Sequence, residues 1–438
     1  MLIVISGAGE VGYNVAKDLS HNYDVVVIEK DEKRASEVDK LNVEVIEGNA
    51  ANLEVLRKAR IYNADFFLAV TGQDEINLLS GVAAKNMGAK KTIVRVGDPE
   101  YVDKPVVKNH FMGYDLVICP QLALANAIAN LVTTPGAVEF VSFSGGKIDM
   151  VELMVPEDSD VIGKRISEIE LPQNIILTAI YRKGELVVPR GDTQILKGDK
   201  ISVLGRSDSI GNITGVFGNP VTRNVFIVGG GIVGSYVARI IDKSNLNIKL
   251  VDSDPELCEN LSGLLKRTRV IVGDGTDLDF LKEEEVGKSD VVISTTDSDG
   301  QNLLISLLAK NLGAKKAIAR VEKGLYAKLF EKVGVDSALS PRTIAYTEVM
   351  KLFRMMNVET IADVEKGEAA VLEITVESQK VSGKMVKDIK LPKKAIIGGI
   401  LRGEDCLIPQ GDTEIKKGDK LLVFTTWDQI EEVESSLS

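Results

Sequence analysis

The stretch IVISGAGEVG, residues 3–12, joins a short apolar run to three glycines in the pattern Gly-x-Gly-x-x-Gly. The apolar run is typical of a buried strand, and glycines after it allow the chain to turn directly into a helix. A second copy of this pattern, VFIVGGGIVG, occupies residues 225–234. The sequence therefore predicts a strand, a tight turn and a helix at two places in the chain.

The two copies belong to a longer internal repeat. TGQDEINLLSGVAAKNMGAKKTIVRV (71–96) aligns without a gap with TDSDGQNLLISLLAKNLGAKKAIARV (296–321). Farther along, VIGKRISEIELPQNII from 161 matches VSGKMVKDIKLPKKAI from 381, and PRGDTQILKGDK from 189 matches PQGDTEIKKGDK from 409. Self-similarity at this scale indicates a duplicated unit. We call its parts N-module 1, C-module 1, N-module 2 and C-module 2, in chain order.

Each N-module alternates strand and helix patterns, which predicts a parallel sheet covered by helices on both faces. The C-modules contain short strands separated by Pro, Gly and Asp, with one brief helix expected near IGKRISEI (162–169). We therefore expect an α/β protein with two Rossmann-like parallel-sheet domains, each followed by a small α+β domain. The predicted boundaries are 1–137, 138–218, 219–356 and 357–438, with linkers at 133–138 and 218–220. A helix is expected before each C-module, at 123–132 and 345–355.

Composition excludes several classes of protein. The chain of 438 residues is 44% hydrophobic and 27% charged, with a net charge of −11. That acidic balance argues against a nucleic-acid-binding protein, which needs a basic face. The N-terminus lacks the basic region of a signal peptide, and no apolar run reaches the roughly 20 residues of a membrane span. The three cysteines lack the spacing of a zinc site or disulfide framework, so a cytoplasmic protein is expected.

The glycine patterns point to nucleotide binding. The first glycines, Gly7 and Gly229, would allow the tight turn. The next pair, Gly9 and Gly231, have no side chain, so a pyrophosphate can approach the helix N-terminus. The third pair, Gly12 and Gly234, would let the helix pack closely. The alternative is that the glycines serve packing alone and that no ligand binds.

An acidic residue at the end of the second strand would hold a ribose diol, about 20 residues after the first glycine. Glu29 and Asp252 occupy this position. A carboxylate there repels a 2′-phosphate, which favours NAD or an adenosine nucleotide over NADP. Asn49 and Asp274 follow the third strands, where adenine or ribose would lie.

The two sites are predicted to differ. Gly72, in the loop after the fourth strand, is replaced by Asp297 in the second half. A carboxylate near a phosphate site is unfavourable. Arg95 and Arg320 end the fifth strands and would reach a terminal phosphate, although a structural salt bridge is the alternative for both.

Catalytic groups are scarce. A nicotinamide-dependent dehydrogenase needs a proton donor near the hydride, and the only histidines are His21 and His110. We expect neither histidine to lie at the nucleotide-binding cleft. This makes an oxidoreductase less favoured but leaves it as an alternative. Four aspartates recur in the Gly-Asp pairs of the C-modules, and turns are a better explanation for them than a metal site. They are Asp192, Asp199, Asp412 and Asp419.

The glycine pattern at 3–12, Glu29, the 71–96 segment and PRGDTQILKGDKISVLG together resemble the TrkA family, the regulatory subunits of Trk-type potassium uptake systems built from RCK (KTN) modules. The resemblance spans essentially the whole chain. It implies a non-enzymatic cytoplasmic protein that is peripheral on the inner face of the plasma membrane. It also implies a homotetrameric ring on a membrane-embedded potassium transporter of Trk type, gated by NAD(H), ATP or ADP, with no nucleic-acid partner.

The resemblance also implies two sets of nucleotide-binding residues, with no metal ligands and no catalytic residues. The first set is Gly7, Ala8, Gly9, Glu10, Val11, Gly12, Glu29, Asn49, Thr71, Gly72 and Arg95. The second set is Gly229, Gly231, Ile232, Val233, Gly234, Asp252, Asp274, Thr296 and Arg320.

Overall fold

The computed structural model describes all residues except 104–112, 144–146, 184, 211–212, 219–220, 358–359, 365–368, 379, 404 and 438. The chain divides into two compact units. One unit contains residues 1–129 and 223–350, which hold the sheets of the two N-modules, and the other contains residues 130–222 and 351–438, which hold the sheets of the two C-modules. Within the described residues, the helices are all too short or too polar to cross a membrane.

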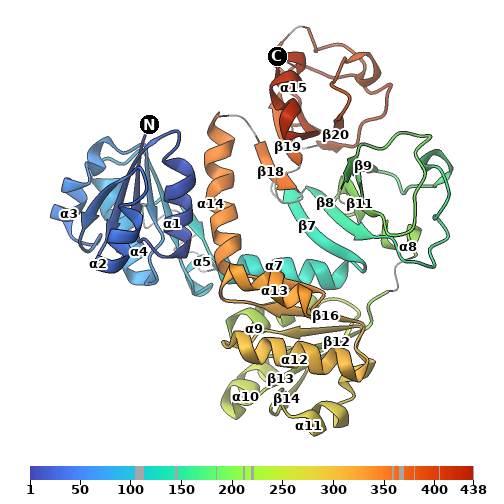
Figure 1. Cartoon of the computed structure of the whole chain (residues 1–438), viewed down its shortest axis with the longest axis horizontal. Coiled ribbons are helices and arrows are strands. Elements are labelled where there is room, and N and C mark those ends of the chain that lie inside the picture. Colours follow the sequence, from blue (N-terminus) through green and yellow to red (C-terminus); the bar gives the residue numbers. More distant parts are fainter. Residues whose placement is uncertain are drawn as a thin grey trace. The chain divides into compact units, whose positions relative to one another are not determined.

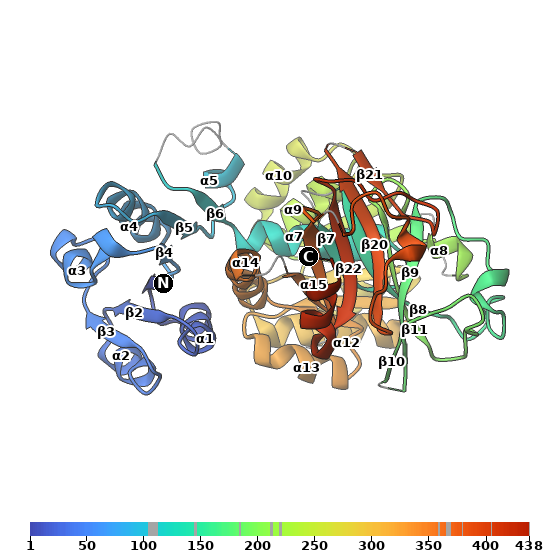
Figure 2. The same ribbon diagram turned by 90° about the horizontal axis from the view of Figure 1, so that it is seen from above.

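N-module 1 is a six-stranded parallel sheet with helices on both faces. Its elements are β1 (Leu2–Ser6), α1 (Glu10–Leu19), β2 (Asp24–Glu29), α2 (Glu32–Val38), β3 (Glu44–Glu47), α3 (Leu53–Lys58), β4 (Phe66–Ala69), α4 (Asp74–Asn86), β5 (Lys91–Arg95), α5 (Glu100–Asp103), β6 (Leu116–Ile118) and α7 (Pro120–Thr133). The strand order is β3-β2-β1-β4-β5-β6. This module is drawn in blue tones in Figure 1. Helices α1 and α2 cover one face of this sheet, and α3 and α4 cover the other (Figure 2).

The first strand forms because its residues are apolar and central. Ile3, Val4 and Ile5 are completely buried, and β1 pairs in parallel with β2 on one side and β4 on the other. A strand buried on both faces reads as a continuous apolar run rather than an alternating one. Helix α1 instead buries Val11, Val15 and Leu19, at helical spacing, against this sheet. The start of α1 therefore lies just after the end of β1, the strand between β2 and β4.

N-module 2 repeats this architecture. Its elements are β12 (Asn224–Val228), α9 (Ile232–Ile241), β13 (Asn247–Asp252), α10 (Pro255–Leu264), β14 (Arg269–Val272), α11 (Leu278–Glu283), β15 (Val291–Ser294), α12 (Asp299–Leu312), β16 (Lys316–Arg320), α13 (Gly324–Lys332), β17 (Ser337–Leu339) and α14 (Pro341–Asn357). The order β14-β13-β12-β15-β16-β17 is that of N-module 1. The predicted α/β fold class is confirmed for both N-modules.

The C-modules are small antiparallel sheets with short helical segments. C-module 1 contains β7 (Ala137–Phe143), β8 (Ile148–Met154), β9 (Ile175–Arg182), β10 (Glu185–Val187), β11 (Lys200–Arg206) and α8 (Ile213–Val216). C-module 2 contains β18 (Thr360–Val364), β19 (Ala369–Thr375), β20 (Ala395–Arg402), β21 (Asp405–Leu407), β22 (Lys420–Thr426) and α15 (Ile430–Leu437). The sheet orders are β10-β9-β11-β8-β7 and β18-β19-β22-β20-β21. Buried residues of both modules share one core, for example Phe143 and Phe424.

Some details differ from the sequence predictions. The expected short helix near residue 166 is a single 3-10 turn, Ile166–Glu168. Strand β7 begins at Ala137, inside the segment predicted as a linker. The final strands of the N-modules, β6 and β17, have only three residues each and were not predicted. So short a strand has no measurable sequence period, and its pairing depends on the neighbouring strand.

Candidate functional site

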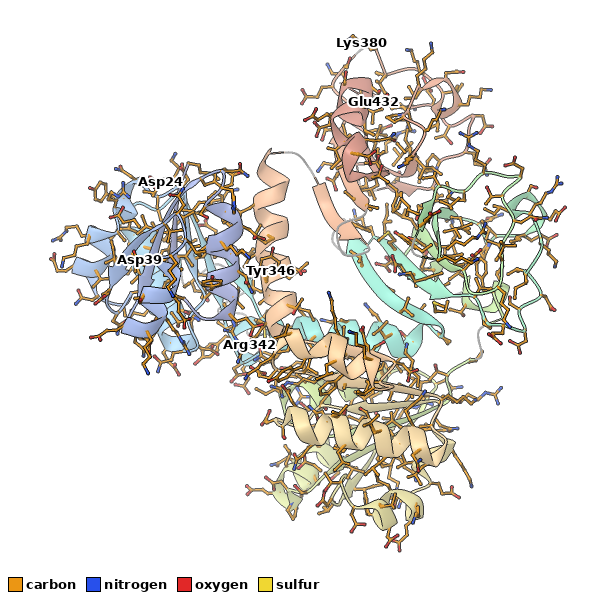
Figure 3. All side chains as sticks on the ribbon, in the orientation of Figure 1. Asp24, Asp39, Arg342, Tyr346, Lys380 and Glu432 are labelled. Atoms are coloured by element: carbon orange, nitrogen blue, oxygen red, sulfur yellow. The ribbon has the colours of Figure 1, made fainter. Side chains whose placement is uncertain are left out.

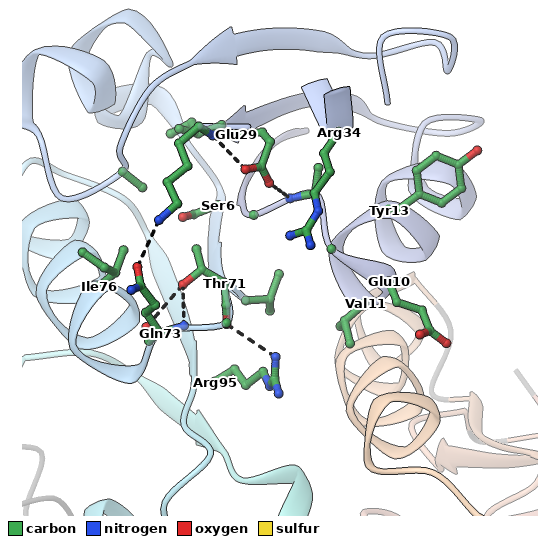
Figure 4. Close-up of a pocket in the computed structure, with 18 of the residues that line it drawn as sticks. Ser6, Glu10, Val11, Tyr13, Glu29, Arg34, Thr71, Gln73, Ile76 and Arg95 are labelled. Atoms are coloured by element: carbon green, nitrogen blue, oxygen red, sulfur yellow. Dashed lines mark hydrogen bonds between the residues drawn. The ribbon is translucent and has the colours of Figure 1, made fainter. Parts of the chain in front are cut away.

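A cavity of about 740 Å³ lies at the carboxyl ends of the strands in N-module 1. In open parallel sheets this edge, where the strand order reverses, is the usual place for ligands. Ten of the eleven residues predicted for the first site line the cavity; the exception is Gly12. Figure 4 shows Glu29, Thr71, Arg95 and Glu10 around this space.

The three glycines of the first loop have different local roles. Gly7 has φ of +99°, and an added Cβ would lie 2.9 Å from Thr71 Cα. A Cβ on Gly12 would lie only 1.8 Å from the Gly7 carbonyl oxygen, so this glycine closes the turn. Gly9 has no atom within 4 Å of such a Cβ and lies at the N-cap of α1. The open approach predicted for a pyrophosphate is therefore present at Gly9.

Glu29 is held by backbone amides at the end of β2. Its side chain is buried, and Oε2 accepts from Ala8 N at 2.5 Å. The other carboxylate oxygen, Oε1, accepts from Lys30 N at 2.8 Å and Asp31 N at 3.0 Å. These three bonds stabilise a buried carboxylate and fix its position between the glycine loop and α2. Asp252 has the equivalent arrangement, accepting from Gly230 N at 2.7 Å and Asp254 N at 2.9 Å.

A buried asparagine, Asn77, connects the ends of β4 and β5 next to the cavity. Asn77 Nδ2 donates to the carbonyl oxygens of Thr71 at 3.0 Å and Arg95 at 2.9 Å, and its Oδ1 accepts from Thr71 N at 2.9 Å. Asn302 makes the same bonds to Thr296 and Arg320. The sequence analysis did not identify these asparagines. Their identical place in the two repeats is the signal that would have found them.

Arg95 is a partly buried cation that lines the cavity. Burial lowers the pKa of its guanidinium below the ordinary value. Its Nη1 donates only a long bond to the Thr71 carbonyl, at 3.4 Å, and its Nε is buried without a hydrogen-bond partner. Across the described part of the chain, no carboxylate forms an ion pair with it. A cation desolvated in this way favours an anionic ligand.

Other lining residues were not predicted. Lys30 and Arg34 lie near Glu29, and Arg34 is visible beside it in Figure 4. Glu322 and Arg342 of N-module 2 also line the first cavity, and both N-modules belong to the same compact unit. Contacts between residues so far apart in the chain leave no local pattern in the sequence.

The second cavity is smaller and acidic. Its volume is about 290 Å³, and the predicted residues that line it are Gly229, Gly231, Asp252, Asp274 and Thr296. The remaining predicted residues, Ile232, Val233, Gly234 and Arg320, do not. Asp254 and Asp297 add two further carboxylates, and no lysine or arginine of the described chain is among the lining residues. This cavity is poorly suited to a polyphosphate.

Arg320 forms ion pairs with two carboxylates, whereas Arg95 forms none among the described residues. Its Nη1 lies 2.7 Å from Asp297 Oδ1, and its Nη2 lies 3.0 Å from Glu322 Oε2. Asp297 is the carboxylate that the sequence predicted to be unfavourable near a phosphate. It pairs with Arg320, the arginine that was expected to contact that phosphate. The alternative of a structural salt bridge is therefore correct for Arg320. Arg95 forms no ion pair among the described residues, so its guanidinium can interact with a ligand.

The other candidate groups lie elsewhere. His21 is in the exposed turn between α1 and β2, bonded to the Lys17 carbonyl, and His110 is outside the described residues. Asp199 and Asp419 receive paired hydrogen bonds from Arg182 and Arg402. Asp192 and Asp412 are exposed in the adjacent turns. Within the described ranges, no group of three acidic, His or Cys residues could hold a metal ion.

Each of the four modules matches a known domain family. The TrkA-N domain family matches residues 3–120 and 225–341, and the TrkA-C domain family matches 150–218 and 371–438. A Trk system potassium uptake protein TrkA homolog of Archaeoglobus fulgidus is 55% identical over 434 residues, covering 99% of both chains. The Trk system potassium uptake protein TrkA of Vibrio alginolyticus is 30% identical, covering 97% of this chain and 95% of that one.

Solved structures share the fold. The GsuK channel bound to NAD has a TM-score of 0.64 at 19% identity, covering 99% of this chain and 78% of that one. The GsuK RCK domain has a TM-score of 0.63 at 20% identity, covering 99% and 94%. The four family matches define a tandem protein of alternating TrkA-N and TrkA-C domains. The chain belongs to the family of Trk system potassium uptake proteins TrkA.

Proposed function

We propose that this chain is a nucleotide-sensing regulatory subunit of a Trk-type potassium uptake system. The observation that carries the proposal is the first cavity, which combines an open glycine loop, a fixed acidic residue and a partly buried arginine that forms no ion pair among the described residues. The relatives over the full length of the chain are named for potassium uptake. The partner is then a membrane-embedded transporter subunit of Trk type, and the chain acts at its cytoplasmic face.

The ligand of the first site is NAD(H), ATP or ADP. The helix N-terminus at Gly9 would hold the pyrophosphate, Glu29 the ribose diol and Arg95 the phosphate farthest from the ribose. Related folds support this assignment, since GsuK structures are described as bound to NAD and to ADP. The remaining residues of the predicted first set surround the same space.

Regulation follows from a population shift. A nucleotide that binds one arrangement of the subunits more tightly increases the share of that arrangement. Two N-modules in one chain would supply two positions of a ring, and a homotetramer is the assembly that we propose. Ligand binding in this account transfers no group and breaks no bond.

A nicotinamide-dependent oxidoreductase is the second candidate, favoured only by the NAD-type glycine loops. The described residues that line the first cavity include Lys30 and Tyr13, two side chains of the types that can donate a proton to a substrate. The full-length relatives are named for potassium uptake rather than for a reaction. Turnover of NADH with added substrates would favour this candidate.

We expect the wild-type protein to bind NADH at least about tenfold more tightly than NADPH, because Glu29 repels a 2′-phosphate. Isothermal titration calorimetry with both nucleotides measures the difference, and NADH absorbance over the same period reports any turnover. Tighter binding of NADPH would contradict the role given to Glu29. Failure of NADH, ATP and ADP all to bind would contradict the proposed function.

Asp297→Gly is expected to strengthen ADP binding at the second site by about tenfold, since it removes a carboxylate and releases Arg320 from one partner. Calorimetry on a background with the first site blocked by Gly9→Asp measures this site alone. Asp279→Gly is the matched control, because Asp279 pairs with Lys282 away from the cavity. Equal ADP affinity in both variants would contradict the account of the second site.

A further inference from the structure

Arg342 lies in the first turn of α14 in N-module 2, yet it lines the cavity of N-module 1. Its Nη1 donates to Glu10 Oε2 at 3.0 Å, at the start of α1. Its Nε and Nη2 donate to Glu322 Oε1 at 3.0 and 2.8 Å. One turn farther along α14, Tyr346 donates a hydrogen bond to Asp18 of α1; Figure 3 labels Arg342 and Tyr346.

The cavity therefore contains two guanidinium groups from different modules. Burial is the main cause that lowers the pKa of Arg95. The like charge of Arg342 lowers it further, while the negative charges of Asp74 and Glu322 oppose the shift. Burial also opposes the charge of Arg342, but hydrogen bonds to Glu322 and Glu10 outweigh it and raise its pKa. Two like charges facing one cavity are stabilised by an anion between them.

Glu10 is the carboxylate of N-module 1 that contacts Arg342 at this cavity. It is the first residue of α1, whose N-terminus attracts negative charge. The side chains of Arg342 and Glu10 are 34% and 33% exposed, so the pair is accessible to solvent and to a ligand. An exposed pair of this kind contributes little to stability, and a phosphate would compete with Glu10 for Arg342.

We propose that Arg342 binds the terminal phosphate of a nucleotide in the first cavity, exchanging Glu10 for that phosphate. N-module 2 thereby sets how strongly N-module 1 distinguishes nucleotides by their number of phosphates. The inference rests on the proposed nucleotide binding at the first site. It makes ligand binding there depend on the contact between α14 and α1.

The arrangement is specific to the first site. The residue that corresponds to Arg342 in the first half is Gln121, after Pro120 as Arg342 follows Pro341. Gln121 is uncharged and does not line the second cavity. Glu322, the other partner of Arg342, also forms an ion pair with Arg320 at the end of β16. A chain of ion pairs therefore joins the two cavities, in the order Glu10, Arg342, Glu322, Arg320 and Asp297.

The test is calorimetry of AMP, ADP, ATP and NADH with the full chain carrying Gly231→Asp, which blocks the second site. Adding Arg342→Gln should weaken ATP about 30-fold and leave AMP and NADH within about threefold, because a charge-assisted bond to a terminal phosphate is lost. Adding Glu10→Gln should instead tighten ATP, since the competing carboxylate is gone. Arg342→Lys should keep part of the ATP preference, since it retains the charge without the planar fork.

Tyr346→Phe is the matched control, because it removes a contact of the same helix with α1 away from the cavity. It should leave the ratio of ATP to AMP affinity unchanged. An unchanged ratio in folded Arg342→Gln would overturn the role of Arg342 while leaving the proposed function intact. If the parent chain binds none of the four nucleotides, the proposed function and this inference both fail.

Discussion

Gly9→Asp is expected to lower the affinity of the first site for NADH and ATP by about a thousandfold while the chain stays folded. The new carboxylate would lie in the approach to the helix N-terminus, and a separation of about 4 Å from a bound phosphate is assumed. Two like charges at that separation cost about 4 kcal/mol near a protein surface, which corresponds to about a thousandfold in affinity. Calorimetry with each nucleotide measures the loss.

Folding should be preserved for two reasons. A Cβ at Gly9 meets no atom within 4 Å, and its φ of −67° is accessible to any residue. Aspartate is also a preferred N-cap residue of helices. Gly231→Asp is the matched control, since Gly231 is equally open at the N-cap of α9 and should leave the first site unchanged. Undiminished binding by folded Gly9→Asp would contradict the assignment of the first site.

Gly12→Ala is expected to destabilise N-module 1 by at least about 4 kcal/mol, although it lies only three residues farther on. The added Cβ would lie 1.8 Å from the Gly7 carbonyl oxygen and 3.0 Å from its carbon, which is backbone that cannot move aside without opening the turn. Urea unfolding followed by circular dichroism should show an early transition for this module.

Gly9→Ala is the control for the same loop, since its Cβ occupies open space. It should unfold at the wild-type urea concentration. If Gly12→Ala unfolds with the wild-type profile, the claim that α1 packs too closely on the turn to admit a side chain is wrong. The pair separates the two functions of glycine in this loop, which are packing at Gly12 and ligand access at Gly9.

The central strands and the glycine turns could be predicted because they depend on local sequence. Ile3 to Ile5 form a run that only a fully buried strand tolerates, and the glycine spacing fixes the turn that follows. The ends of β2 and β5 then place Glu29 and Arg95 at one edge of the sheet. Duplication added a check, since each feature occurs twice.

Other features depend on contacts that no local pattern encodes. Arg342 reaches Glu10 from more than 300 residues away in the chain, so only the packing of α14 reveals it. The three-residue strand β6 is defined by its partner β5 rather than by a period. Asp297 was recognised as unfavourable from its charge, but its pairing with Arg320 requires the geometry of the loop.

The central claim is tested most directly by potassium flux. Vesicles would contain a Trk-type transporter with the wild-type chain or with Gly9→Asp, and uptake would be recorded with and without ATP, ADP and NADH. The account predicts that at least one nucleotide changes the uptake rate with the wild-type chain and that Gly9→Asp abolishes this change. Uptake that responds to no nucleotide, or that responds equally with both chains, would contradict it.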